Sequence, residues 1–382
     1  MKIGILTQPL LSNYGGLLQN YALQQTLIRA GHDVETLDHA NYGKFSNPLY
    51  AILLPWFLYA LGRQGYPKYQ LTDKEKLVIY SKTEKFINKY LKRTVILKSE
   101  KDFVKQGKEG GYDAYVVGSD QCWRPCYNGR TIQDMFLNFV GAESNVRRIA
   151  YAASFGTDVW EYTPEQTARF APLAQRFDLV TVREDSGVKL CKDYFGVTAT
   201  HVLDPTMLLT KEDYIRIINA EKEPKAKGSL FNYILDPDTT KTSFINRVAN
   251  ELCLTPFQVL PKHQAETRTK EDVKKRIEDC VFFGVTAWLR AFMDAEMVIV
   301  DSFHGMVFSI IFNKPFWVIG NAERGMARFN SLLKLFTLEN RLIDVAHLDS
   351  VDFAKPIDWN NVNTLLEQQR ACSKRLLLNA LK

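Results

Sequence analysis

Residues 297–320 read MVIVDSFHGMVFSIIFNKPFWVIG. The apolar run Met297–Val300 is followed by the polar turn 301–305, a second apolar run at 306–313 and a third at 315–320. Apolar runs of these lengths, separated by polar turns, are typical of a buried parallel strand, a helix and a second strand. The stretch therefore predicts a β–α–β unit with Asp301-Ser302-Phe303-His304-Gly305 at the carboxyl end of its first strand.

The same alternation recurs on the amino-terminal side of this stretch. Lys2–Thr7 reads as a strand, a glycine-rich loop and a helix to Ala30 follow, and Val34–Asp38 reads as the next strand. Further strands are expected at 114–118, 148–153, 179–182, 201–205, 229–235 and 256–260. Strands alternating with helices in both halves predict an α/β fold of two Rossmann-like, doubly wound domains that face a cleft.

The chain of 382 residues has room for two or three domains. We expect a first domain at 1–205 with a lysine-rich helical excursion at 43–110, and a second domain at 206–345. A helical extension is expected at 346–382, which holds a long helix at 360–381. Pro205 and the turn after it mark the expected end of the first domain.

Composition narrows the classes of partner. A net charge of +6 is mild for this length, so it does not require nucleic acid and suits a cleft that receives an anionic small molecule. Of the six cysteines only Cys122 and Cys126 lie close in sequence, and no histidine stands at metal-ligand spacing from them. We therefore expect buried structural thiols and no metal site.

Two features bear on location. The first strand begins at the amino terminus, so we expect no export signal and a cytoplasmic protein. Residues 49–61 read LYAILLPWFLYAL, which is shorter than the roughly 20 apolar residues that span a bilayer. A buried helix pair is one interpretation of 49–61, and a flap that docks on the inner membrane face or on a partner is the other.

Ligands of open α/β sheets bind beyond the carboxyl ends of the strands, and polar residues gather there in this sequence. The loop Asn13-Tyr14-Gly15-Gly16 precedes a helix, where backbone N–H groups can approach an anion, although a plain turn with a capping asparagine fits equally. His304 can donate to an anionic ligand or act as a general acid. Asp120 is a candidate base, or else it caps the turn that follows it.

Three arginines are candidates for binding an anion. Arg183 directly follows a predicted strand, and Arg324 and Arg328 follow the last one. Their guanidinium groups suit a carboxylate or a phosphate, but salt bridges on the protein are the alternative. The aromatic rings of Trp123, Tyr127 and Trp160 are candidates for stacking on a sugar, with core packing as the alternative.

Five motifs together resemble the polysaccharide pyruvyl transferase family. They are GILTQPLLSNYGGLLQNYALQ (4–24), VVGSDQCW (116–123), VREDSGV (182–188), HVLDPTMLL (201–209) and DSFHGMVFSIIFNKPF (301–316). The matching blocks run in order from about residue 3 to residue 345 and leave out mainly the 43–110 excursion. The set in this order is more specific than any one block.

The resemblance implies a fold similar to the GT-B glycosyltransferases and an enzyme without an organic cofactor. It implies phosphoenolpyruvate as donor, and as acceptor a sugar of a surface polysaccharide, such as a capsule or exopolysaccharide, or its lipid-linked precursor. The product would be a pyruvate ketal, with release of phosphate. His304 would be the acid or a donor contact, and Arg183 a donor contact.

The residues expected at the site fall into three groups. Those expected in catalysis are His304 and Asp120, and those expected to bind the donor are Arg183, Ser302, Gly305, Arg324 and Arg328. An acceptor- or anion-binding loop is expected from Asn13, Tyr14, Gly15, Gly16, Gln19, Ser119 and Trp123. Many members of the family have an arginine two residues before the histidine, where this sequence has Ser302. Arg324, Arg328 or Arg290 would then supply the cation.

Two other functions share the predicted fold. One is a GT-B glycosyltransferase that uses a nucleotide sugar, and the other is a glycan-binding protein without catalytic activity. Preference for a nucleotide sugar over phosphoenolpyruvate would favour the first, and absence of donor binding the second.

Overall fold

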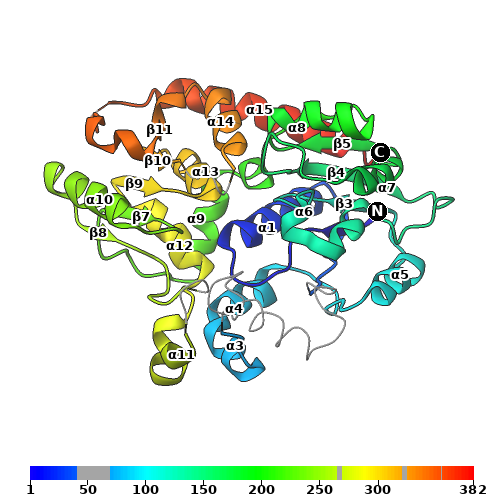
Figure 1. The fold of residues 1–382 in the computed structure, drawn as a ribbon, viewed down its shortest axis with the longest axis horizontal. Coiled ribbons are helices and arrows are strands. Elements are labelled where there is room, and N and C mark those ends of the chain that lie inside the picture. The colour runs from blue at the N-terminus through cyan, green and yellow to red at the C-terminus, as the bar shows by residue number, and fades with distance from the viewer. Residues whose placement is uncertain (41–68, 265–268, 321–324, 354) are drawn as a thin grey trace.

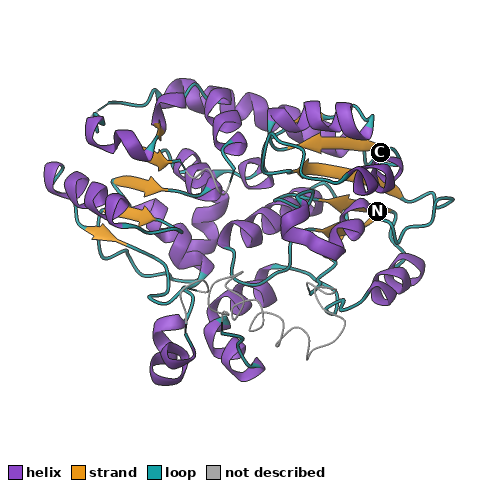
Figure 2. Ribbon diagram, in the orientation of Figure 1, coloured by secondary structure: helices purple, strands orange, loops and turns teal. Residues whose placement is uncertain are grey.

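The computed structural model describes residues 1–40, 69–264, 269–320, 325–353 and 355–382, and these form two separate parallel sheets (Figures 1 and 2). The first sheet has the order β2–β1–β3–β4–β5–β6, with β1 (Lys2–Leu6), β2 (Asp33–Thr36), β3 (Ala114–Val117), β4 (Arg147–Ala153), β5 (Leu179–Val182) and β6 (Thr200–His201). All neighbouring pairs run parallel. The two Rossmann-like sheets predicted from the sequence are thus confirmed.

The second sheet has the order β11–β10–β9–β7–β8. Its strands are β7 (Leu230–Tyr233), β8 (Pro256–Phe257), β9 (Met297–Val300), β10 (Phe316–Ile319) and β11 (Leu342–Ile343), again all parallel. The strands β7, β9 and β10 are completely buried along their length, which explains why the sequence shows them as unbroken apolar runs.

Helices connect the strands and cover the sheets. They are α1 (Tyr14–Arg29), α3 (Asp73–Ile79), α4 (Ser81–Tyr90), α5 (Glu100–Glu109), α6 (Pro125–Asn128), α7 (Pro164–Ala174), α8 (Asp185–Leu190), α9 (Lys211–Ala220), α10 (Thr239–Glu251), α11 (Lys270–Arg276), α12 (Val285–Asp294), α13 (Phe303–Ile311), α14 (Ala327–Leu335) and α15 (Trp359–Asn379). The part of the expected 43–110 excursion that the structure describes contains α3, α4 and α5. The apolar 49–61 segment lies outside the described residues, and in the described chain no helix is long and apolar enough to cross a membrane.

Both sheets reverse their strand order at one point. The chain leaves β1 for β2 on one side and returns to β3 on the other, and it leaves β7 for β8 before it returns to β9. In open parallel sheets such switch points open a crevice beyond the strand ends, which is where ligands bind. We therefore expect the ligand-binding site at the loops after β1, β3, β7 and β9.

The two halves share one hydrophobic core. Tyr14 at the start of α1 stacks on Trp288 of α12 with ring centroids 5.7 Å apart, and the Tyr14 hydroxyl donates to the carbonyl of Phe283 at 3.1 Å. Both aromatic side chains are buried. This contact brings the amino terminus of α1 against the second sheet's helices.

The long helix α15 returns to the first half of the molecule, as Figure 1 shows. Leu377 packs in the core that includes Ile3 and Ile5 of β1, and the hydroxyl of Ser373 accepts from the backbone N–H of Leu203 at 3.1 Å. The buried Arg370 donates to the carbonyls of Met207 and Leu209, at 2.7 and 3.2 Å. The helix therefore fastens the segment that joins the two sheets.

Replacing Arg370 by methionine should destabilise the protein. The substitution keeps much of the side chain's volume but leaves two buried carbonyls without their charged donor, so we expect a loss of about 2–4 kcal/mol in the free energy of unfolding. Urea unfolding measures this. The exposed Arg375 of the same helix is the control, and Arg375→Met should change the free energy by less than about 0.5 kcal/mol. Equal effects of the two substitutions would contradict this role for Arg370.

Candidate active site

A cavity of about 370 Å³ lies between the two sheets, within the size range of small-molecule sites. The loops after β1, β3, β7 and β9 and the start of α14 contribute to its wall. Its lining residues are Gln8, Pro9, Leu11, Ser12, Asn13, Gly15, Asp120, Gln121, Tyr127, Tyr233, Leu235, Trp288, Asp301, Ser302, Phe303, His304, Arg328 and Phe329. The cavity therefore occupies the crevice that the two switch points predict.

His304 lies in the first turn of α13, at the positive end of that helix. The helix is capped by Ser302, whose hydroxyl accepts from the backbone N–H of Gly305 at 3.1 Å. A Cβ on Gly305 would lie 2.7 Å from the Ser302 hydroxyl and from a methyl of Val300, so this glycine permits tight packing under the turn. Ser302 lines the cavity, whereas Gly305 supports it from behind.

Gly15 in the first turn of α1 lies directly against the His304 ring. A Cβ at Gly15 would come within 2.0 Å of the histidine Nδ1, so only glycine fits there. The imidazole thus bridges the amino terminus of α13 and the amino terminus of α1.

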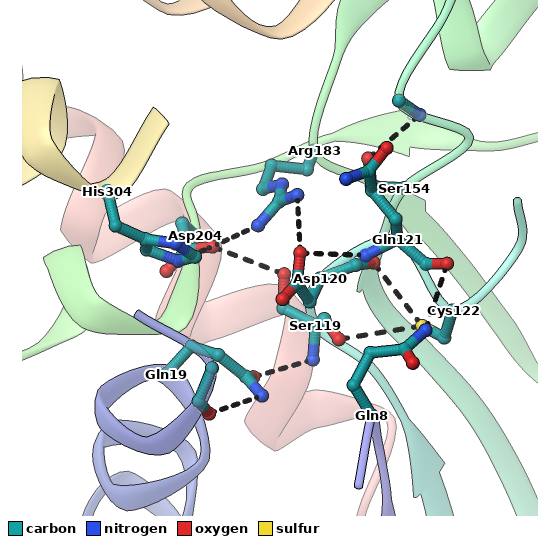
Figure 3. Close-up of polar contacts among 12 residues, drawn as sticks. Gln8, Gln19, Ser119, Asp120, Gln121, Cys122, Ser154, Arg183, Asp204 and His304 are labelled. Atoms are coloured by element: carbon teal, nitrogen blue, oxygen red, sulfur yellow. Dashed lines mark hydrogen bonds and ion pairs between the residues drawn. The ribbon is translucent and has the colours of Figure 1, made fainter. Parts of the chain in front are cut away.

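Arg183 forms the centre of a buried network of charges (Figure 3). Its Nη2 lies 3.2 Å from Oδ1 of Asp120, and its Nη1 lies 2.9 Å from Oδ2 of Asp204. Arg183 is 2 % exposed and does not line the cavity. The direct donor contact expected for Arg183 does not fit this burial, because both guanidinium ends are already bound to carboxylates. Its geometry instead fits the positioning of Asp120 and Asp204.

Asp120 presents its carboxylate to the cavity from the turn after β3. Burial alone would raise its pKa, but the positive groups Arg183, His304 and Arg328 outweigh burial, and the pKa lies below its usual value. Asn13 donates to its Oδ2 at 3.2 Å, and the backbone N–H of Gln121 donates to its Oδ1 at 2.9 Å. Asp120 is therefore a carboxylate held in one orientation.

Asp204, after β6, links the arginine to the histidine. Its Oδ2 lies 3.5 Å from Nε2 of His304 as well as 2.9 Å from Arg183. Burial again opposes ionisation, yet the charges of His304 and Arg183 keep the pKa of Asp204 below its usual value. From the sequence, Asp204 stands among the polar residues that follow predicted strands, but no role was predicted for it. Its motif, HVLDPTMLL, was the available signal.

Arg328 supplies a cation to the cavity from the first turn of α14. Burial, together with repulsion from Arg183, lowers its pKa to about 10, so the guanidinium stays charged at neutral pH. Both arginines contact the ring of Phe303, whose centroid lies 4.4 Å from the Arg183 guanidinium and 5.7 Å from that of Arg328. Arg290, the other substitute considered, instead pairs with Asp294 on its own helix, and Arg324 lies outside the described residues.

The expected anion loop divides into lining and supporting residues. Asn13 and Gly15 line the cavity, but the Asn13 side chain also caps α1 by accepting from the N–H of Gly16 at 3.1 Å. The Tyr14 ring is buried against Trp288 and does not line the cavity. The loop therefore contributes a helix amino terminus more than a chain of free N–H groups.

Three further residues expected at the site are fully buried and do not line the cavity. Gln19 accepts from the backbone N–H of Ser119 at 2.8 Å, and the Ser119 hydroxyl donates to the carbonyl of Ala152. Trp123 stacks on Phe136 at 5.2 Å, and its indole N–H donates to a backbone carbonyl. Sugar stacking by Trp123 is thus excluded by its burial in the core, and Gln19 and Ser119 brace the turn that carries Asp120.

Aromatic side chains form the remaining wall. Tyr127 is 41 % exposed at the cavity, and Tyr233, Trp288 and Phe329 also line it. Tyr127 was one of the rings proposed for stacking, but Trp160 stacks on Tyr194 away from the lining residues. Tyr233 and Phe329 had no signal in the sequence beyond their positions next to strand ends and a helix start.

The two parallel sheets facing one cavity define a GT-B-like fold. The UDP-GlcNAc 2-epimerase of Neisseria meningitidis, solved with UDP-GlcNAc bound, aligns with a TM-score of 0.50 and 10 % identity over 100 % of this chain and 99 % of its own. The Methanocaldococcus jannaschii UDP-GlcNAc 2-epimerase aligns with a TM-score of 0.47 and 12 % identity over 98 % of this chain and 99 % of its own. The E. coli ADP-heptose heptosyltransferase II aligns with a TM-score of 0.38 and 11 % identity over 97 % of this chain and 99 % of its own. At such identities the likeness concerns the fold alone.

The sequence itself specifies the family. Residues 13–323 match the polysaccharide pyruvyl transferase family, and the chain belongs to that family. No curated protein shows a significant sequence match. The match contains every cavity-lining segment except the residues before 13 and after 323.

Replacing Arg183 by methionine should destabilise the protein most at neutral pH. Removing one partner of a buried ion pair costs about 3–5 kcal/mol, because the carboxylates remain buried without a cation. In the wild type both carboxyl pKa values lie below 3.8, so this stabilisation is present at neutral pH and is lost as the pH falls through those lowered values. In the variant, burial without the cation raises the carboxyl pKa values. The difference in the free energy of unfolding between the wild type and Arg183→Met, measured by urea unfolding, should therefore become smaller as the pH is lowered from 7 to 5.

Arg290→Met serves as the control for this pH dependence. It breaks a partly buried pair with Asp294 and a long contact with the carbonyl of Glu223, so we expect a smaller loss than for Arg183→Met, with little change between the two pH values. A destabilisation by Arg183→Met that is the same at pH 7 and pH 5 would contradict the proposed charge network.

Proposed function

We propose that this protein transfers the enolpyruvyl carbons of phosphoenolpyruvate to two hydroxyls of an acceptor sugar and forms a pyruvate ketal. The main support for the proposal is one cavity at which the amino termini of α1, α13 and α14 lie. The same cavity is lined by Arg328 and His304. Helix amino termini and arginine favour anions, and phosphoenolpyruvate has both a phosphate and a carboxylate. Membership of the pyruvyl transferase family supports the same donor.

Arg328 binds the donor in this proposal. Many family members have an arginine at the position of Ser302, which here caps α13. The Arg328 side chain lines the same cavity from α14, and its guanidinium lies 5.7 Å from the ring of Phe303 in the first turn of α13. In this proposal Arg328 of α14 takes the place of the arginine that many family members have at position 302.

The reaction needs one acid and one base. His304 gives a proton to the methylene carbon, which becomes the methyl group, and the adjacent carbon gains positive character and accepts an acceptor hydroxyl. The bond from that carbon to the phosphate oxygen then breaks, and the second hydroxyl closes the ketal. Of the two hydroxyl protons one replaces the proton given by His304, and the other leaves with the phosphate as hydrogen phosphate.

Asp120 is the proposed partner of the attacking hydroxyl. A carboxylate with a lowered pKa is a weak base, and such a base suits a hydroxyl whose proton becomes acidic only as the new C–O bond forms. The exposed ring of Tyr127, with the buried Tyr233 and Trp288 behind it in the cavity wall, offers the acceptor sugar an apolar face beside this carboxylate.

Donor binding can be measured before the acceptor is known. A ligand at 100 times its dissociation constant stabilises the native state by about 2.7 kcal/mol, which gives a clear shift in thermal unfolding. We expect phosphoenolpyruvate to produce this shift in the wild type and to lose it in Arg328→Met, because the cation is removed from the cavity. Arg290→Met, which removes an arginine that does not line the cavity, should keep it.

Nucleotide sugars and inorganic phosphate belong in the same measurement. Stabilisation by a nucleotide sugar in preference to phosphoenolpyruvate would favour a GT-B glycosyltransferase and contradict the proposal. Stabilisation by neither would favour a glycan-binding protein without activity.

A further inference from the structure

We propose that Asp204 is a positioning residue that keeps a proton on Nε2 of His304 and thereby makes Nδ1 the atom that exchanges protons with the substrate. This inference rests on the proposed function for the role of His304, but its geometry and its test do not depend on the identity of the donor. It assigns the two ring nitrogens different tasks.

The Nε2 atom is enclosed by protein. It is inaccessible to solvent and makes no hydrogen bond within the described residues, and its charged neighbour is Oδ2 of Asp204 at 3.5 Å. A carboxylate is only an acceptor, so it attracts an N–H group and repels a nitrogen lone pair. In structures without bound substrate such contacts are often long and shorten when the substrate binds.

Asp204 cannot turn away from the histidine. Its Oδ1 accepts from the backbone N–H and the hydroxyl of Thr206, at 3.0 and 2.7 Å. Its Oδ2 accepts from Nη1 of Arg183 at 2.9 Å, and the hydroxyl of Ser119, whose closer contact is the carbonyl of Ala152, lies 3.3 Å from the same oxygen. With the side chain fully buried and both oxygens bound, the direction of the carboxylate is fixed before any substrate arrives.

The Nδ1 atom lies on the Gly15 side of the ring. The position that a Cβ of Gly15 would take is 2.0 Å from Nδ1, and Gly15 and His304 both line the cavity. A side chain at residue 15 would clash with this nitrogen, so glycine is needed for this edge of the ring to lie at the cavity wall. The two nitrogens therefore face a fixed carboxylate and the cavity, respectively.

The surrounding charges fit this division. The carboxylates of Asp120 and Asp204 and the guanidinium groups of Arg183 and Arg328 interact electrostatically around the histidine. Among these groups the carboxylate of Asp204 is the one that faces Nε2, so orientation toward Asp204 selects the protonated nitrogen. Catalytic triads use an aspartate in the same manner to fix the histidine tautomer.

The nitrogen chemical shifts of the imidazoles in ¹⁵N-labelled protein test this inference directly. The chain has six histidines, so the signals of His304 can be assigned by their disappearance in His304→Gln. When the ring is neutral, we expect its proton on Nε2, with a proton resonance shifted downfield and protected from exchange by the charged acceptor. In Asp204→Asn a neutral amide replaces that acceptor, so the downfield resonance should be lost or move upfield.

Thr206→Val is the matched variant. It removes one hydrogen bond to the same carboxylate but keeps its charge, so the fold should be weakened while the Nε2 proton resonance stays in place. A proton on Nδ1 in the neutral wild type, or an unchanged Nε2 resonance in Asp204→Asn, would overturn the inference. If the resonances behave as expected and phosphoenolpyruvate does not bind, the role of Asp204 stands and the proposed donor fails.

Discussion

The site depends on one buried cation. Arg183 is almost completely buried and is balanced by Asp120 on one side and Asp204 on the other. Because an uncompensated buried charge is costly, neither carboxylate can leave without a large loss of stability. The turn after β3 and the segment after β6 are thereby held at a fixed separation, and the histidine of the second sheet is placed against the second carboxylate.

Close packing between the halves completes this arrangement. Gly15 allows the first turn of α1 to touch the His304 ring, and Tyr14 next to it stacks on Trp288. A second close approach joins Gly325 to the carbonyl of Gly156, where a Cβ would lie 1.9 Å from the oxygen. The cavity wall is therefore built from both sheets, and its geometry depends on glycines as much as on charged groups.

Much of the fold could be predicted from the sequence, because its strands are buried runs between polar turns. Residues 179–182 and 297–300 form strands with the predicted bounds. Of the expected strand 201–205 only His201 is in β6, because Asp204 caps a short helical segment that begins at Pro205. Of the expected strand 256–260 only the first two residues form β8, which lies at the edge of its sheet. The two-residue strand β11 was not predicted, because so short a segment has no periodicity.

The position of the site could be predicted from the sequence better than the roles of its individual residues. Asp120 follows a strand of the first sheet and His304 a strand of the second, and the carboxyl ends of both strands face one cavity. The direction in which a side chain points does not follow from that position. The burial of Trp123 and Gln19 could therefore not be predicted. The sequence left open whether Arg183 binds an anion or forms a salt bridge. Its partners could not be identified, because Asp204 is 21 residues away in the sequence and Asp120 is 63 residues away.

The structure of the protein with phosphoenolpyruvate bound would test the central claim most directly. We expect the phosphate or the carboxylate to lie on the Arg328 guanidinium and the methylene carbon to lie about 3–3.5 Å from Nδ1 of His304, a distance at which a proton can be transferred. Donor bound away from Arg328, or a methylene carbon on the Asp204 side of the ring, would contradict it.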